Sequence, residues 1–223
     1  MACEWYAALF LTTSNLAMLP AIVFAFIYSH PWCGTYFSLV MTVSTLYHTC
    51  MCDKGCFLFP RWTYGNLDYI CSHGMIPILC AFLMDMRSWK WRAVVYQLSF
   101  VLCMAMVLTD RHSWEYRAAM LGFGVAALLT KIVLIDRRLP PRVAGRSYGI
   151  TVMGLVLILM GSMLFFFKMP GQYWITHSFW HMLVFVGTAL VVYGFSRKPQ
   201  RGKRRVATTT TLYTSQAQFV IPQ

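Results

Sequence analysis

Seven long apolar stretches constrain this chain more than any other feature. Each is about 17 to 24 residues long, enough for a helix to cross the roughly 30 Å hydrocarbon core of a bilayer. They cover residues 5–28, 32–50, 67–84, 93–109, 118–135, 148–167 and 174–195. Because they are continuously apolar, and because a backbone in lipid must satisfy its own hydrogen bonds, they predict helices rather than barrel strands. With 58% hydrophobic and 12% charged residues, the composition excludes a water-soluble domain and favours an all-α polytopic membrane protein, a seven-helix bundle.

The distribution of Lys and Arg predicts the orientation of this bundle, since these residues accumulate on the cytoplasmic side of membrane proteins. If the N-terminus lies outside, 14 of the 19 Lys and Arg residues fall in inner connections and the C-terminal tail, and 5 fall outside. We therefore expect an outer N-terminus and a cytoplasmic C-terminus. The net charge of +12 then reflects topology, and runs such as Arg137-Arg138 indicate a membrane surface rather than a nucleic-acid site.

The chain divides into one large unit and a tail. Residues 1–195 form the predicted transmembrane domain. Residues 196–223 are polar, basic and Thr-rich, which is typical of a flexible cytoplasmic tail. The first apolar stretch follows Glu4 rather than a cationic region, so it predicts a retained helix and not a cleaved signal peptide. We identify no second domain and no repeat.

Four ionisable residues lie in these apolar surroundings: His48, Asp68, His177 and His181. A charge at the centre of a membrane helix costs roughly 2.5–3.5 kcal/mol, so such residues are functional candidates by default. His177 and His181 are four residues apart and share a helix face, where two imidazoles can bind one metal ion. The predicted topology places all four residues near the outer surface. Imidazoles from His48, His177 and His181 together with one water would suit a tetrahedral zinc ion, so we expect zinc as the cofactor.

Two further roles near this site stay open between alternatives. Ser44 lies four residues before His48 and shares its helix face, so its hydroxyl is a candidate for orienting water or an oxyanion. Alternatively, it bonds back to a carbonyl of its own helix, as serines in membrane helices often do. Asp68 is a candidate general base for a water activated by the metal, or it merely orients a ligand imidazole.

A second polar group, Asp110-Arg111-His112, follows the fourth apolar stretch on the same predicted outer face. As a rim of the site it would cover the entrance or hold a lipid phosphate through Arg111. The alternative is simple neutralisation of Asp110 by Arg111 at the membrane interface. His73 falls on a different helix face from Asp68 and is expected to pack rather than to bind metal.

The eight cysteines fall into two groups. Cys50, Cys52 and Cys56 lie at the predicted outer end of the second stretch, where an oxidising compartment favours disulfides, with Cys3 as a further candidate partner. Thiolate metal binding is the alternative for this group. Three cysteines within the stretches are expected to be small buried hydrophobes, namely Cys71, Cys80 and Cys103. Cys33 is not assigned.

The ordered combination of short motifs resembles a known superfamily. The motifs are Ser44-x-x-x-His48, Leu67-Asp68-Tyr69 and His177-x-x-x-His181. They resemble the CREST superfamily of alkaline ceramidases, progestin and adipoQ receptors and related membrane hydrolases. Segments 44–50, 108–112 and 177–183 look most like its transmembrane protein 8 branch, which includes proteins of myoblast fusion. One departure is that Met51 and Cys52 precede Asp53, where the family has His-x-Cys-Asp.

This resemblance implies zinc bound by His48, His177 and His181, with Ser44 and Asp68 beside it. It implies a multi-pass protein of the plasma membrane, with Golgi or other secretory membranes as further locations, that promotes cell–cell fusion through lipid mixing. The implied partners are membrane lipids. A fusion partner on the same or the opposing cell and a second copy of the chain are further candidate partners, which the resemblance does not decide. The alternative function is a zinc-dependent hydrolase of lipid amides or esters, of ceramidase or phospholipase type, so enzymatic activity stays open.

Overall fold

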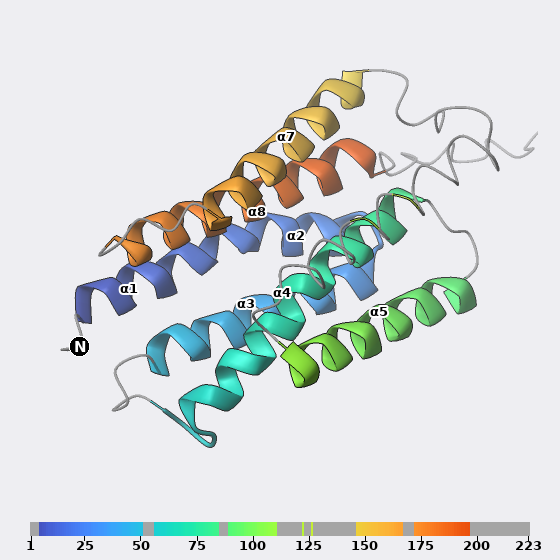
Figure 1. The fold of residues 1–223 in the computed structure, drawn as a ribbon. Coiled ribbons are helices and arrows are strands. Elements are labelled where there is room, and N and C mark those ends of the chain that lie inside the picture. The colour runs from blue at the N-terminus through green and yellow to red at the C-terminus, as the bar shows by residue number, and fades with distance from the viewer. Residues whose placement is uncertain are drawn as a thin grey trace, which may run out of the picture.

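The computed structural model describes residues 5–50, 56–84, 89–110, 122, 126, 146–166 and 172–196. Every regular element in these residues is a helix (Figure 1). In chain order they are α1 (Trp5–Ser14), the 3₁₀ turn η1 (Asn15–Met18), α2 (Leu19–Ile27), α3 (Pro31–Thr49), α4 (Arg61–Leu83), α5 (Trp89–Asp110), α7 (Arg146–Phe166) and α8 (Tyr173–Phe195). The prediction of an all-α chain is thus confirmed for the described part. The predicted span 118–135 and the tail beyond Ser196 lie outside it, except for residues 122 and 126, which are helical.

The helices have the length and composition of a helical membrane protein. Three helical stretches of the described part are long and apolar enough to cross a bilayer, namely Trp5–Ile27, Arg61–Leu83 and Tyr173–Phe195. Shorter apolar helical segments, Ala93–Ala105 and Gly149–Leu164, lie within α5 and α7. The crossing of a membrane by seven spans and the outer position of the N-terminus stay predictions.

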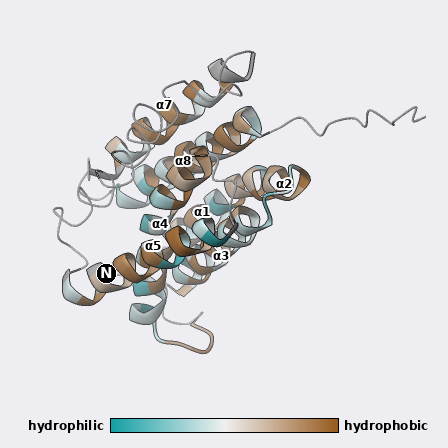
Figure 2. Ribbon diagram, turned by 90° about the vertical axis from the view of Figure 1, so that its right-hand side faces the viewer, coloured by the Kyte–Doolittle hydropathy of each residue, from teal (hydrophilic) through white to brown (hydrophobic). Residues whose placement is uncertain are grey.

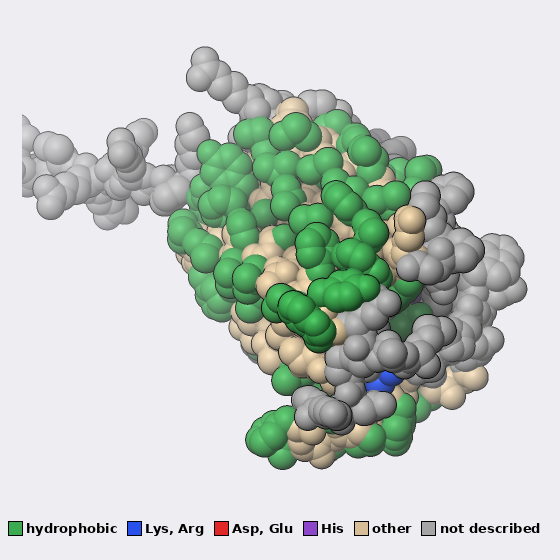
Figure 3. Space-filling model, turned by 90° about the vertical axis from the view of Figure 1, so that its left-hand side faces the viewer, with side chains coloured by type: hydrophobic (Ala, Val, Ile, Leu, Met, Phe, Trp, Pro, Cys, Tyr) green, Lys and Arg blue, Asp and Glu red, His purple; other side chains and the backbone are tan. Residues whose placement is uncertain are grey.

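Large apolar side chains cover the outside of the bundle as well as its interior. Hydrophobic residues colour most of the ribbon in Figure 2, and they dominate the bundle end at which α1 and α8 begin, seen in Figure 3. On α7, for example, Val156, Leu159, Met160 and Met163 are each at least half exposed. Water-soluble monomers rarely expose continuous apolar surface of this kind. The outer face therefore fits contact with lipid tails.

The first apolar stretch is not one uninterrupted α-helix. Asn15–Met18 forms a 3₁₀ turn between α1 and α2, and Pro20 stands in the first turn of α2. Proline has no N–H to donate, so it suits the start of a helix and disrupts its interior. Short 3₁₀ segments inside long helices often mark functional positions. In this chain the turn places Ser14 and Asn15 in the interior, where both are buried.

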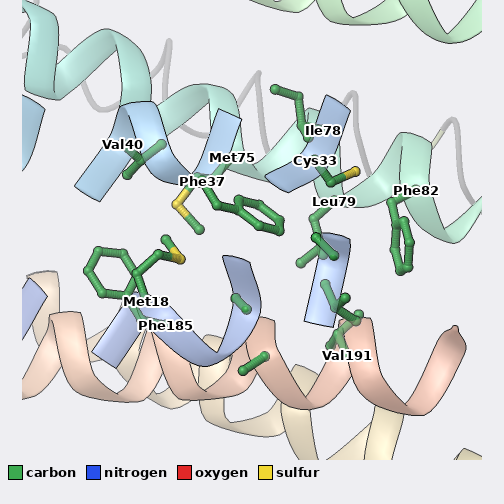
Figure 4. Packing of buried hydrophobic residues seen from close by; sticks show 14 of the residues in the cluster. Met18, Cys33, Phe37, Val40, Met75, Ile78, Leu79, Phe82, Phe185 and Val191 are labelled. Atoms are coloured by element: carbon green, nitrogen blue, oxygen red, sulfur yellow. The ribbon is translucent and has the colours of Figure 1, made fainter. Parts of the chain in front are cut away.

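The helices pack in the order α7, α8, the α1–η1–α2 unit, α3, α4 and α5 (Figure 1). The central core is formed where α2, α3, α4 and α8 meet, and in Figure 4 Met18, Phe37 and Phe185 point into this common interior. Among the described helices, α7 and α8 approach each other especially closely. A Cβ at Gly154 would lie 2.6 Å from the carbonyl oxygen of Gly187, and a Cβ at Gly187 would lie 2.6 Å from that of Gly154. Only glycine allows the two backbones to approach this closely.

Candidate metal centre

Three buried imidazoles meet between α3 and α8. His48 is the penultimate residue of α3, and His177 and His181 lie one turn apart on α8. Their candidate ligand nitrogens all lie within 4.8 Å of one another. The ring centroids of His48 are 5.2 Å from those of His177 and His181, which are themselves 4.7 Å apart. Residues about 130 positions apart in the chain therefore share one site, as the sequence predicts.

The chemistry of this cluster fits a transition metal such as zinc. Zinc lies roughly 2.0–2.1 Å from histidine nitrogens, so tetrahedral ligands are about 3.3 Å apart. The candidate ligand nitrogens, all within 4.8 Å of one another, would have to approach to this value around a bound ion. In addition, the Nε2 atom of His181 is fully buried and makes no hydrogen bond. Such an atom costs roughly 1–3 kcal/mol when unsatisfied, and a bound metal ion would satisfy it.

Ser14 of α1 supports the cluster by contacting His181, and the sequence analysis missed it. Its Oγ lies 3.1 Å from Nδ1 of His181 and donates a hydrogen bond of 2.7 Å to the carbonyl oxygen of Leu11. The available signal was the polar run Thr12-Thr13-Ser14-Asn15, which interrupts the first apolar stretch. Asn15 is also fully buried, and neither atom of its amide makes a hydrogen bond.

Ser44 and Asp68 form a hydrogen-bonded pair across the α3–α4 contact. Ser44 is 2% exposed and Asp68 is 6% exposed, so both lie in the interior. The hydroxyl donates to the carboxylate, which assigns Ser44 a partner outside its own helix. Asp68 does not belong to the group of mutually close ligand atoms, so this structure gives it no ligand role. It lies seven positions after the first residue of α4, about 10 Å along the helix, rather than at the helix start.

Aromatic rings enclose the imidazoles. The ring of Tyr173 stacks on His177 with centroids 4.8 Å apart, and Trp180 lies 4.7 Å from His181. Phe185 contacts the far side of His181 at 5.2 Å. At the first turn of α4, Arg61 forms a side-chain hydrogen bond with Tyr47 of α3. The cluster is thus surrounded by apolar surface, with a cation and several phenol groups near the helix ends.

The other polar candidates behave differently from the cluster. Asp110 is the last residue of α5, whereas Arg111 and His112 lie outside the described residues, so the rim stays a prediction. His73 stacks on Tyr69 with centroids 5.3 Å apart, and its Nδ1 lies 2.8 Å from the Tyr69 carbonyl oxygen. This agrees with the predicted packing role.

The cysteines also divide as the sequence predicts. Cys50 and Cys56 form a disulfide. Cys52 and Cys3 lie outside the described residues. Among the described residues, the other cysteines are buried, namely Cys33, Cys71, Cys80 and Cys103. The unassigned Cys33 has its Sγ 3.4 Å from the hydroxyl of Tyr96.

Comparison with known proteins adds a family to this geometry. No curated protein matches the chain significantly. One family model matches residues 4–182, a range that contains Ser14, Ser44, Asp68 and all three histidines of the cluster. The chain therefore belongs to the family described as a protein of unknown function, DUF3522.

Proposed function

We propose that this chain is a zinc-binding, multi-pass protein of the plasma membrane that promotes cell–cell fusion of the myoblast type, similar to myomaker in the transmembrane protein 8 branch. The observation that carries the zinc site is the convergence of His48, His177 and His181 from two helices far apart in the sequence. The motif resemblance supplies the link to fusion. The 14-to-5 distribution of Lys and Arg supports an outer N-terminus and, with it, a position of the cluster near the outer leaflet.

In this proposal the zinc ion has a structural task. It joins the end of α3 to the start of α8 and so holds the outer ends of the bundle in one arrangement. The apolar side chains exposed on the helices then contact lipid and, together with a partner protein or a second copy of the chain, favour lipid mixing between adjacent membranes. The secretory pathway, including the Golgi, would carry the protein to the cell surface.

A second candidate is a zinc-dependent hydrolase of lipid amides or esters. The specific observation in its favour is the Ser44–Asp68 hydrogen bond near the cluster. A bound zinc ion would supply Lewis-acid chemistry toward a lipid carbonyl. Asp68 would accept the proton of the attacking water, and the Ser44 hydroxyl would hold the carboxylate in position. Nucleic acid is no partner in either proposal.

Expression of variants in cells that do not fuse tests the two functions together. Wild type, Asp68→Asn, His177→Ala and the control His73→Ala would be compared for surface level, bound zinc, content mixing between cells and release of fatty acid or lysolipid. His73 is a suitable control because it removes an imidazole of the same bundle outside the cluster.

We expect His177→Ala to lose zinc and fusion, while Asp68→Asn reaches the surface and still fuses. Zinc- and Asp68-dependent lipid hydrolysis by purified protein would instead support the enzyme. Wild-type protein that reaches the surface without causing content mixing, in the presence of a partner-expressing cell, would contradict the fusion proposal. Purified wild type without zinc would contradict both.

A further inference from the structure

The hydroxyl of Ser14 lies between a carbonyl oxygen and an imidazole nitrogen, and this arrangement determines where its single proton goes. The Oγ is 2.7 Å from the carbonyl oxygen of Leu11 and 3.1 Å from Nδ1 of His181. Ser14 is 7% exposed and His181 is fully buried, so water does not compete for these bonds. Although Ser14 precedes the 3₁₀ turn, its side chain makes no capping hydrogen bond there.

Only one assignment of protons satisfies both contacts. A carbonyl oxygen has no proton, so the short Ser14–Leu11 contact requires the hydroxyl to donate to Leu11. If the hydroxyl donated to the imidazole instead, two oxygen lone pairs would face each other at 2.7 Å. The serine oxygen must therefore accept from His181, which requires a proton on Nδ1. In a neutral imidazole with Nδ1 protonated, Nε2 carries the lone pair.

We propose that Ser14 positions His181 as a metal ligand by holding it in the Nδ1–H tautomer. This inference rests on the proposed zinc site and adds the first helix to it. The Nε2 atom is the buried nitrogen that makes no hydrogen bond, which agrees with a lone pair directed at a metal rather than at a protein donor. Through the hydroxyl of Ser14, α1 thus determines which nitrogen of His181 is available to bind a metal ion.

Two measurements on purified protein in detergent test this proposal. The first is ¹⁵N NMR of metal-free protein labelled at histidine, with the His181 signals assigned by comparison with His181→Ala. We expect the His181 proton on Nδ1 in wild type and a mixture of tautomers in Ser14→Ala. The second is a competition titration with Zn²⁺. Loss of a hydrogen bond to a ligand imidazole typically lowers metal affinity about 10–100-fold, and we expect a loss in this range for Ser14→Ala.

Two more variants separate positioning from general loss of structure. Thr13→Ala is the matched control, because Thr13 is exposed and its hydroxyl bonds only to carbonyls of its own helix, at Leu9 and Phe10. It should bind Zn²⁺ as wild type does. Ser14→Thr keeps the hydroxyl and should restore the Nδ1–H tautomer and most of the affinity.

A wild-type spectrum with the His181 proton on Nε2 would overturn the proposal, as would unchanged zinc affinity in Ser14→Ala. The spectrum needs no variant to fold and no metal to bind. If wild type bound no zinc, the proposed function would therefore fail, while the tautomer of His181 would still decide this inference.

Discussion

Gly187→Ala is expected to destabilise the protein, because it places a methyl group where α7 and α8 cross. A Cβ at this position would lie 2.6 Å from the carbonyl oxygen of Gly154, 2.8 Å from Cγ1 of Ile158 and 3.0 Å from the Ile158 nitrogen. Ordinary contact begins at 3.4 Å, so the helices must separate locally by about 0.8 Å in a closely packed interior. Overpacking of this kind costs roughly 1–3 kcal/mol, and the higher helix propensity of alanine returns about 1 kcal/mol. We expect a net loss of up to about 2 kcal/mol.

Gly149→Ala provides the matched control on α7. A Cβ at Gly149 meets no atom within 4 Å, so this variant gains helix propensity without a clash and should be as stable as wild type or slightly more stable. Both variants would be unfolded by heat or by denaturing detergent in the same micelle, with helicity as the signal. Equal stability of Gly187→Ala and Gly149→Ala would refute the inference that glycine is required at the crossing.

Three further outcomes follow from the site and the disulfide. Zn²⁺ at a hundred times its Kd should raise the unfolding free energy by about 2.7 kcal/mol, measured by thermal unfolding with and without chelator, and an equal rise in His177→Ala would refute this. Ser44→Ala should lower the unfolding free energy by roughly 1–3 kcal/mol, because the buried carboxylate of Asp68 loses its hydrogen-bond donor. The control Ser178→Ala should leave the unfolding free energy unchanged, because the buried hydroxyl of Ser178 makes no hydrogen bond. Equal unfolding midpoints of the two variants would contradict this contrast. Replacing Cys50 and Cys56, six positions apart, by Ser should cost about 2 kcal/mol, and unchanged stability in non-reducing conditions would show that the bond constrains little.

In the described part of the chain, the apolar stretches predicted the helices well but not where they begin. The third stretch was expected to start at Leu67, whereas α4 starts at Arg61. Apolar composition indicates only the part of a helix at the depth of the hydrocarbon, while backbone hydrogen bonding continues into the polar interface. Pro60 in front of Arg61 is the local signal for this start, since proline favours the beginning of a helix and disrupts its interior.

The three clustered histidines could be identified from the sequence because imidazoles are costly in a membrane and two of them share a helix face. Ser14 could not be identified in this way. A serine within an apolar helix most often bonds to a carbonyl of the preceding turn, and Ser14 does make that bond, to Leu11. Its second contact, with His181, depends on how α1 packs against α8, which no local pattern encodes.

The burial of the cluster bears on the choice between a structural and a catalytic zinc ion. His48 and His181 are completely buried, and His177 retains 6% exposure. Tyr173 lies over that residue, with its ring stacked on the imidazole. In the described part of the chain, a lipid carbonyl would therefore have little access to the three imidazoles. A structural ion needs no such path. The number of ligands does not make this distinction, because three histidines leave one coordination position for water, as catalytic zinc sites do. This closure of the site favours the fusion proposal, in which the ion joins α3 to α8.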